Sequence, residues 1–276
     1  MADPTTAEHS GRGINHLTCP PLVPDLFLQR DQPPGVPPLA LDGERTLPDV
    51  PEENYWFRRH LVVYEWIAAR VGGVRVVDLA CGEGYGSDVL AGSAYRVVGV
   101  DANPDAHEHA RLRYRAPNLR FVRNMVETYS EACDAVVFLQ TIEHVHDPDG
   151  VLENVKGMLQ AGGTAYVSTP NVLTLAPKGA ERSGNPWHLR EYRAEEFRAL
   201  CAAHFGSVEL YGLFHARRLR VHELALRAGW DRVHAALRLT EPFYDRFVPA
   251  ISTRDFALRG ERDLDRALDF VAVLRP

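Results

Sequence analysis

The sequence has little lysine, little cysteine and no long apolar run. Two of its 31 basic residues are lysines, and its four cysteines include no C-x-x-C pair. That spacing excludes a zinc ribbon, and free thiols are typical of a reducing compartment. No stretch approaches the roughly 18 apolar residues of a membrane-spanning helix, and the N-terminus lacks the basic and apolar regions of a signal peptide. We therefore expect a cytoplasmic protein with no membrane partner.

Clustered basic charge is also lacking. The 276 residues carry a formal net charge of −6, with 45% hydrophobic and 25% charged residues. Binding to phosphate backbones depends on grouped arginines and lysines, so this balance disfavours nucleic acid as a partner. The length and composition are those of a globular chain with one large domain or two small ones.

Proline is unevenly distributed and predicts the domain boundary. Residues 1–51 hold ten of the nineteen prolines, including four between positions 33 and 38. Such a segment forms neither a helix nor a regular strand ladder. We expect a Pro-rich N-terminal tail over 1–51, mobile or lying on the surface of a domain that spans 52–276.

From Glu52 onward, helical patterns alternate with short apolar runs. An amphipathic helix is expected before the Gly72-Gly73 stop. Strand and helix alternation of this kind favours a parallel sheet with helices on both faces. The expected strands are 74–79, 96–100, 119–122, 135–139, 164–168, 207–211 and 269–274. Residues 213–265 form an insertion before the last strand, helical at least over 217–238.

A glycine-rich turn follows the first expected strand. Gly82, Gly84 and Gly86 open a helix, and glycine there lets a ligand approach the backbone closely. Asp78 stands just before them, where it would repel a pyrophosphate but hold a cationic amino group. Asp101 ends the second strand, where a carboxylate accepts ribose hydroxyls. One cationic end and one ribose without phosphate describe S-adenosylmethionine, and Asp78 disfavours a nicotinamide enzyme.

These residues resemble the class I S-adenosylmethionine-dependent methyltransferases over about 52–276, most strongly over 74–171. The matching positions are the first motif at 76–84, Asp101, Asn124-Met125 (Asp is common at the first of these), the fourth motif at 138–144, and 159–163 followed by 168–171. The resemblance implies an α/β, Rossmann-like, seven-stranded sheet whose last strand is antiparallel, with a helical cap inserted at about 213–265.

The resemblance also implies which residues hold the cofactor. Most lie on the turns after the first four strands, and two lie on the helix before the sheet, which covers the cofactor in similar proteins. The expected cofactor-binding residues are Asp78, Ala80, Cys81, Gly82, Gly84, Asp101, Ala102, Asn124, Met125, Gln140, Tyr55 and Arg59. His107 and His109, on the helix after Asp101, are expected on a solvated face.

A second group of residues has the composition of a metal site. Gln140, Glu143 and His144 follow the fourth strand, and His188 lies downstream of Thr169-Pro170-Asn171. A carboxylate, two imidazoles and an amide oxygen can hold Mg²⁺ or Mn²⁺. Ubiquinone-pathway O-methyltransferases carry a similar Glu-His pair. Small-RNA 3′-terminal 2′-O-methyltransferases resemble the whole set, but with a glutamate where Gln140 stands.

Two roles are open for this group. A metal would lower the pKa of an acceptor hydroxyl and orient it, or a histidine would act alone as general base. Glu143, His144 and His188 are the expected catalytic residues, and the same three with Gln140 the expected metal ligands. In the plainer alternative, the Glu-His pair caps the next helix or packs beside the cofactor.

The leading hypothesis is therefore an O-methyltransferase acting on a hydroxyl of a small molecule or saccharide. The saccharide follows from a partial resemblance of residues 185–191 and the C-terminal segment to actinobacterial methyltransferases, some of which modify oligosaccharide-bearing redox cofactors of the mycofactocin type. The alternatives are an RNA-ribose 2′-O-methyltransferase, which the net charge opposes, and a non-catalytic cofactor-binding partner protein, which the complete cofactor motif opposes.

Overall fold

An eight-stranded mixed sheet forms the centre of the protein. The computed structural model describes residues 25–27, 29, 32–41, 45–177, 179–237, 239–260 and 263–276. The strand order is β5-β4-β3-β6-β7-β10-β8-β9. These strands are β3 (Arg75–Leu79), β4 (Arg96–Asp101), β5 (Leu119–Arg123), β6 (Cys133–Leu139), β7 (Leu159–Pro170), β8 (Ser207–His215), β9 (Phe256–Gly260) and β10 (Asp269–Arg275).

The first five of these strands are parallel, as the βα alternation predicts. β3 pairs with β4 and β6, β4 with β5, and β6 with β7. β10 lies between β7 and β8 and is antiparallel to both. The expected antiparallel last strand is therefore present, and the carboxyl ends of the parallel strands meet at one edge of the sheet.

The expected count of seven strands was wrong, because the insertion before the last strand contributes an eighth. β8 continues past Tyr211 to His215, and β9 pairs antiparallel with that extension, from Tyr211 opposite Gly260 to His215 opposite Phe256. Without β9, the extension would leave its backbone groups on an open edge, where unpaired N–H and C=O groups favour strand addition. The segment 256–260 is short and is separated from β8 by helices, so the sequence pattern did not reveal it.

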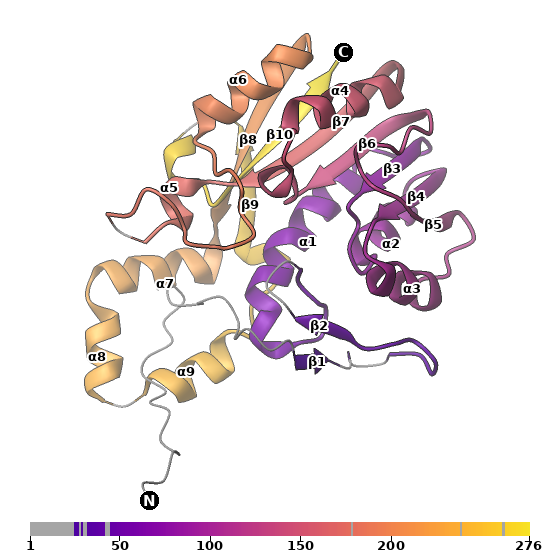
Figure 1. The fold of residues 1–276 in the computed structure, drawn as a ribbon. Helices are drawn as coiled ribbons and strands as arrows, with labels where there is room; N and C mark the ends of the chain where they lie inside the picture. Colours follow the sequence, from indigo (N-terminus) through magenta and orange to yellow (C-terminus); the bar gives the residue numbers. More distant parts are fainter. Residues whose placement is uncertain are drawn as a thin grey trace, which may run out of the picture.

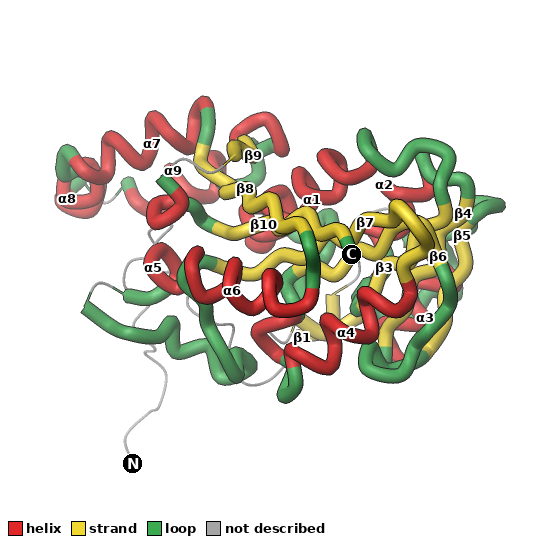
Figure 2. The backbone as a smooth tube through the Cα atoms, turned by 90° about the horizontal axis from the view of Figure 1, so that it is seen from above, coloured by secondary structure: helices red, strands yellow, loops and turns green. Residues whose placement is uncertain are grey.

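Helices cover both faces of the sheet. Figure 2 shows α1 (Asn54–Ala68) and α2 (Tyr85–Ala91) on one side and α4 (Pro148–Met158) and α6 (Ala194–His204) on the other. Each pair buries an apolar stripe in a separate core cluster against the sheet. Two further helices, α3 (Pro104–Arg113) and α5 (Val172–Leu175), follow β4 and β7. None of the described helices is long and apolar enough to cross a membrane.

Three helices of the insertion project from one end of the sheet. They are α7 (Arg217–Arg227), α8 (Trp230–Ala236) and α9 (Thr240–Phe247), at the lower left of Figure 1. His222 on α7 stacks on Phe247 of α9 with ring centroids 4.8 Å apart, and Phe243 stacks on Phe247 at 5.1 Å. These stacked rings hold α7 and α9 together as a small unit.

The described part of the N-terminal segment packs beside α3. β1 (Asp25–Phe27) and β2 (Leu39–Leu41) pair antiparallel, and Leu39, Leu41, Leu47 and Val50 form a small core of their own. The carbonyl of Pro37 lies 2.7 Å from Nδ1 of His109. His109 is fully buried, so its expected solvated position was wrong. The N-terminal segment, whose position the helix pattern does not reveal, covers it.

A buried ion pair fastens α1 to β10. Nε and Nη2 of Arg59 donate to the two carboxylate oxygens of Asp269 at 2.7 and 2.6 Å, and Nη2 also donates to the Leu268 carbonyl at 2.8 Å. Both side chains are almost completely buried. Burial alone would lower the pKa of Arg59. The Asp269 carboxylate outweighs that effect and raises the pKa of Arg59 above its ordinary value.

We predict that replacing Asp269 with Leu lowers the free energy of unfolding by about 3–5 kcal/mol, because it leaves the Arg59 charge buried without its partner. The double variant Arg59→Met/Asp269→Leu should recover much of that loss. Urea denaturation measures both. As a control, Glu209→Gln removes an exposed ion pair between Glu209 on β8 and Arg275 on β10, and it should cost less than about 1 kcal/mol. A loss below 1 kcal/mol for Asp269→Leu would contradict the prediction.

Candidate active site

The predicted site residues follow the carboxyl ends of β3, β4, β5 and β6. In open parallel sheets this edge is where ligands bind. Adjacent pairing of β3 and β6, with Leu79 opposite Phe138, places the turn after Leu79 beside the turn after Leu139. The glycine-rich turn and the Glu-His segment are therefore neighbours in space, although about 60 residues separate them in sequence.

The glycine-rich turn between β3 and α2 has left-handed backbone at Ala80, Gly82 and Gly84. At Gly84 a Cβ atom would lie 2.9 Å from both the Ala110 side chain and the Phe121 ring, so a larger residue does not fit. This turn is therefore pressed against α3 and β5. The neighbouring Cys81 is buried, and burial raises the pKa of its thiol, so this residue serves packing rather than thiolate chemistry.

Asp78 is completely buried at the end of β3. It accepts hydrogen bonds from Ser87 Oγ at 2.6 Å and from the Tyr64 hydroxyl at 3.2 Å. Both of these donors are neutral, and burial raises the pKa of Asp78 to about 7. A cationic ligand group would favour the ionised carboxylate.

Asp101 is fixed beside the same turn. Its Oδ2 accepts from the backbone N–H of Gly82, and its Oδ1 accepts from that of Asn103, both at 2.8 Å. The two predicted acids are thus brought to opposite ends of one short turn. Ala102, which follows Asp101, is exposed.

The turn after β5 brings Asn124 and Met125, two of the expected cofactor-binding residues, to the same place. The backbone N–H of Asn124 donates to the Asp101 carbonyl at 3.1 Å. Its side-chain oxygen accepts from Met125 N and from Thr128 Oγ1, both at 2.8 Å, so the amide orders its own turn. Met125 is 53% exposed, which leaves its thioether accessible for an aromatic ligand.

The two predicted cofactor contacts on α1 have protein partners. The Tyr55 hydroxyl lies 2.8 Å from Nε2 of His215, and Arg59 is paired with Asp269 as described above. Among the described residues, these hydrogen bonds join Tyr55 and Arg59 to β8 and β10 rather than to the glycine-rich turn. Cofactor contact by Tyr55 and Arg59 stays a prediction.

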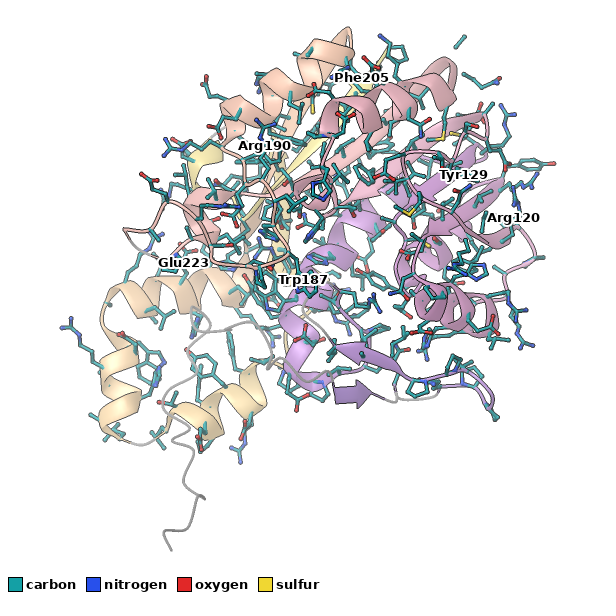
Figure 3. All side chains as sticks on the ribbon, viewed as in Figure 1. Arg120, Tyr129, Trp187, Arg190, Phe205 and Glu223 are labelled. Atoms are coloured by element: carbon teal, nitrogen blue, oxygen red, sulfur yellow. The ribbon has the colours of Figure 1, made fainter. Side chains whose placement is uncertain are left out.

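Glu143, His144 and His188 form a compact cluster. One ligand atom of each lies within 4.8 Å of the others. Glu143 and His144 belong to a short 3-10 turn after β6, and His188 lies on the loop that leads toward α6. Their rings and carboxylate thus come from two segments that are 44 residues apart in sequence. Figure 3 shows the loop through the labelled Trp187 and Arg190.

Glu143 carries the buried carboxyl group of this cluster. Thr169 Oγ1 donates to its Oε2 at 3.0 Å, and burial raises the pKa of Glu143 to about 8. A carboxylate with a neutral donor is stabilised by a nearby cation. The donor set of one carboxylate and two imidazoles fits a divalent metal.

The two histidines each use Nδ1 for a hydrogen bond to the loop that carries His188. His144 Nδ1 donates to the Trp187 carbonyl at 2.9 Å, because a carbonyl only accepts. Its Nε2 lies 4.0 Å from Glu143 Oε1, and burial lowers the pKa of His144, which favours the neutral ring. His188 Nδ1 lies 2.8 Å from Glu191 Oε1. In each neutral ring Nε2 is then the unprotonated nitrogen.

Gln140, the fourth predicted metal ligand, has a partner on β7. Its Nε2 donates to Ser168 Oγ at 3.0 Å, and its backbone is in the left-handed region. Membership of Gln140 in a ligand set or cofactor site stays a prediction. The structure brings the other three predicted ligands together.

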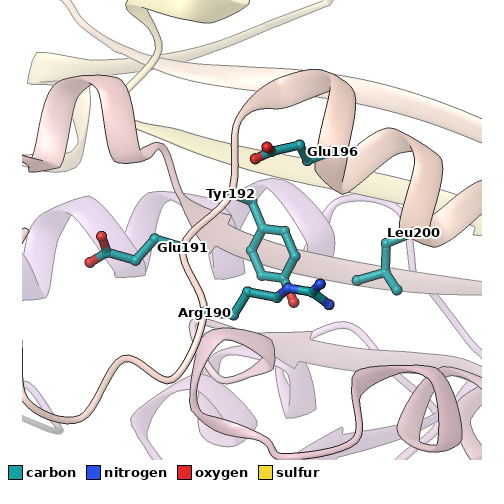
Figure 4. A pocket seen from close by; sticks show the side chains of 5 residues that line it. All are labelled: Arg190, Glu191, Tyr192, Glu196 and Leu200. Atoms are coloured by element: carbon teal, nitrogen blue, oxygen red, sulfur yellow. The ribbon is translucent and has the colours of Figure 1, made fainter. Parts of the chain in front are cut away.

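Sequence reasoning missed the partners that orient this cluster. Glu191, Trp187 and Thr169 were within quoted segments, but no spacing rule connects them to His188, His144 and Glu143. A groove beside the loop is lined by Arg190, Glu191, Tyr192, Glu196 and Leu200. In Figure 4 the Glu191 carboxylate points away from Tyr192 and Leu200, in agreement with its bond to His188.

Comparison with known proteins shows which family the chain is similar to. A family model described as a methyltransferase domain matches residues 23–224. A probable S-adenosylmethionine-dependent methyltransferase of Mycolicibacterium smegmatis is 39% identical over 250 residues, which cover 86% of this chain and 96% of that protein. A protein of the same description from Mycobacterium tuberculosis (strain H37Rv) is 38% identical over 252 residues, covering 86% and 90%.

A more distant relative and a solved structure are similar over shorter or more divergent stretches. A ubiquinone biosynthesis O-methyltransferase of Xanthomonas campestris is 31% identical over 129 residues, 42% of this chain and 54% of that protein. A crystal structure of a methyltransferase from Thermotoga maritima, titled a possible histamine N-methyltransferase, has a TM-score of 0.55 at 16% identity and covers 81% of this chain and 94% of its own. The chain belongs to the class I S-adenosylmethionine-dependent methyltransferase family.

Proposed function

We propose that this methyltransferase transfers the methyl group of S-adenosylmethionine to a hydroxyl group of a small molecule or saccharide. The observation that carries the proposal is the cluster of Glu143, His144 and His188 beside the glycine-rich turn. The names of the mycobacterial relatives support the cofactor, and the Xanthomonas relative supports an oxygen acceptor.

For the cofactor, we assign the buried Asp78 to the amino-acid end and Asp101 to the ribose. The ammonium group would favour the ionised form of Asp78, whose described donors are neutral. The glycine-rich turn supplies the close backbone approach, and Met125 lies on the adenine side. In this arrangement the methyl group would face the turn after β6.

The reaction is an in-line displacement. The acceptor oxygen attacks the methyl carbon, the carbon–sulfur bond breaks, and S-adenosylhomocysteine leaves with the sulfur electron pair. The hydroxyl proton passes to a base, and Nε2 of His144 or His188 is available for it. Orienting the oxygen for this attack supplies a large part of the rate enhancement.

Glu143, His144 and His188 would hold a divalent metal such as Mg²⁺ or Mn²⁺, with Gln140 as a further candidate. Such an ion lowers the pKa of a bound hydroxyl and fixes its orientation. The buried Glu143 carboxyl and the two imidazoles grouped with it are the features that fit it.

An exposed tryptophan that precedes His188 in the sequence supports a saccharide acceptor. Trp187 is 44% exposed, and its carbonyl is the partner of His144. Flat aromatic faces provide large apolar contact area with a polar edge, which suits the apolar face of a sugar ring. Vicinal sugar hydroxyls would also suit the cluster.

S-adenosylhomocysteine should raise the melting temperature of the protein, and NAD should not. A ligand at 100 times its dissociation constant adds about 2.7 kcal/mol, a shift of several degrees for a chain of this size. Asp101→Ala should abolish most of the shift, because it removes the expected ribose acceptor. A thermal-shift titration checks this. An equal shift in wild type and Asp101→Ala would contradict the ribose assignment.

Binding of S-adenosylhomocysteine should strengthen as the pH rises through 7. The raised pKa of Asp78 means that its carboxyl is mostly protonated at pH 6 and mostly ionised at pH 8. The cationic amino group binds the ionised form, so we expect about tenfold weaker binding at pH 6 than at pH 8. Calorimetric titration measures it. In Asp78→Asn the affinity should be weaker and nearly independent of pH, and a pH slope like that of wild type would exclude Asp78 as its source.

Replacing His188 with Ala should lower turnover about 10²–10⁴-fold, the usual contribution of a general base, while binding of S-adenosylhomocysteine stays within twofold. Methyl transfer to a panel of saccharides and vicinal diols, with Mn²⁺ and with a chelator, measures turnover. His146→Ala is the matched control, because His146 is an exposed histidine two residues from His144. Full activity of His188→Ala would show that the acceptor site lies elsewhere.

A further inference from the structure

The bond between His188 and Glu191 is well shielded from water. Nδ1 of His188 and Oε1 of Glu191 are 2.8 Å apart, and the two side chains are 6% and 5% exposed. An ionised carboxylate only accepts, so Nδ1 is the donor. A neutral His188 therefore has its free electron pair on Nε2, the nitrogen available to the cluster.

The Glu191 carboxylate is itself held in place by the start of the same loop. The backbone N–H of Ser183 donates to Oε2 at 2.9 Å, and Ser183 Oγ donates to Oε1. Ser183 Oγ accepts in turn from the backbone N–H of Asn185 at 3.1 Å. These bonds fix the carboxylate in one orientation, whereas a carboxylate free in water would rotate.

The same loop orients the other histidine and is fixed to the third member of the cluster. The Trp187 carbonyl accepts from His144 Nδ1, so each of the two imidazoles is held through its own Nδ1. The backbone N–H groups of Leu189 and Arg190 donate to the Glu143 carbonyl at 2.9 and 3.1 Å. The segment from Ser183 to Glu191 thus sets the direction of both imidazoles relative to Glu143.

We propose that Glu191 is a positioning residue that holds His188 in the Nδ1–H tautomer and directs its unprotonated Nε2 toward Glu143 and His144. The use of that nitrogen on a hydroxyl or a cation rests on the proposed function, but the tautomer does not. Hydrogen-bond partners of this kind commonly change metal affinity or activity 10–100-fold when removed.

The first test reads the tautomer directly in the metal-free protein. Two-dimensional NMR of ¹⁵N-histidine-labelled protein distinguishes a protonated from an unprotonated ring nitrogen, and a His188→Gln spectrum assigns the signal. Wild type should show the Nδ1–H form. Glu191→Leu, which has no acceptor, should lose it, and Glu191→Gln, which retains an acceptor oxygen without the charge, should lie between the two.

Ser183→Ala separates positioning from loop bracing. It removes the hydroxyl bonds to Glu191 and Asn185 but leaves Glu191 beside His188. The tautomer should stay Nδ1–H in this variant. If Ser183→Ala and Glu191→Leu change the spectrum equally, Glu191 acts only as a brace and the inference is overturned.

The second test measures Mn²⁺ affinity by electron paramagnetic resonance. Glu191→Leu should bind Mn²⁺ 10–100-fold more weakly than wild type, and the exposed Glu195→Leu should bind within twofold of it. An unchanged tautomer or an unchanged affinity in Glu191→Leu would overturn the inference. If wild type shows the Nδ1–H form but binds no Mn²⁺, the metal part of the proposed function fails, and the positioning inference stands on the spectrum.

Discussion

The burial of carboxyl groups at one edge of the sheet is the constraint on which the rest of this structure depends. Asp78, Glu143 and Asp269 are all almost completely buried there. An ionised carboxylate in a dry environment is costly unless a cation or several hydrogen bonds compensate it. Asp269 is compensated by the protein itself, because Arg59 donates a hydrogen bond to each of its carboxylate oxygens.

The other two carboxyl groups are left with neutral donors. Ser87 and Tyr64 donate hydrogen bonds to Asp78, and Thr169 donates one to Glu143. Burial raises the pKa of Asp78 to about 7 and that of Glu143 to about 8. Strongly shifted acids in a cleft are typical of functional sites. The family's cofactor would bring a cation to the first, and the proposed acceptor chemistry would use the second. Asp269 therefore stabilises the fold, whereas Asp78 and Glu143 have no cationic side chain as a described hydrogen-bond partner and would accept a cationic ligand.

Local patterns in the sequence were enough to predict the five parallel strands and the acids that end them. Strand periodicity placed Asp78 and Asp101 at the ends of β3 and β4. The left-handed backbone at Gly82 and Gly84 is a further finding of the structure at the predicted glycine-rich turn. Contacts between distant segments were not accessible in the same way. The Arg59–Asp269 pair joins residues 210 positions apart, the burial of His109 depends on the N-terminal segment, and β9 is defined by its pairing with β8.

The candidate acceptor site shows the same division between its reactive groups and their supports. The Glu143-His144 pair and His188 can be recognised in the sequence, because their residue types alone suggest metal binding or base chemistry. Glu191 does not, since a glutamate on a loop resembles any solvated charge until its carboxylate is found 2.8 Å from an imidazole. Its role depends on a direction, because a histidine with the other tautomer would occupy the same space and present a proton where an electron pair is needed. Residues that fix direction rather than supply a reactive atom are therefore the part of this site that only the folded chain could reveal.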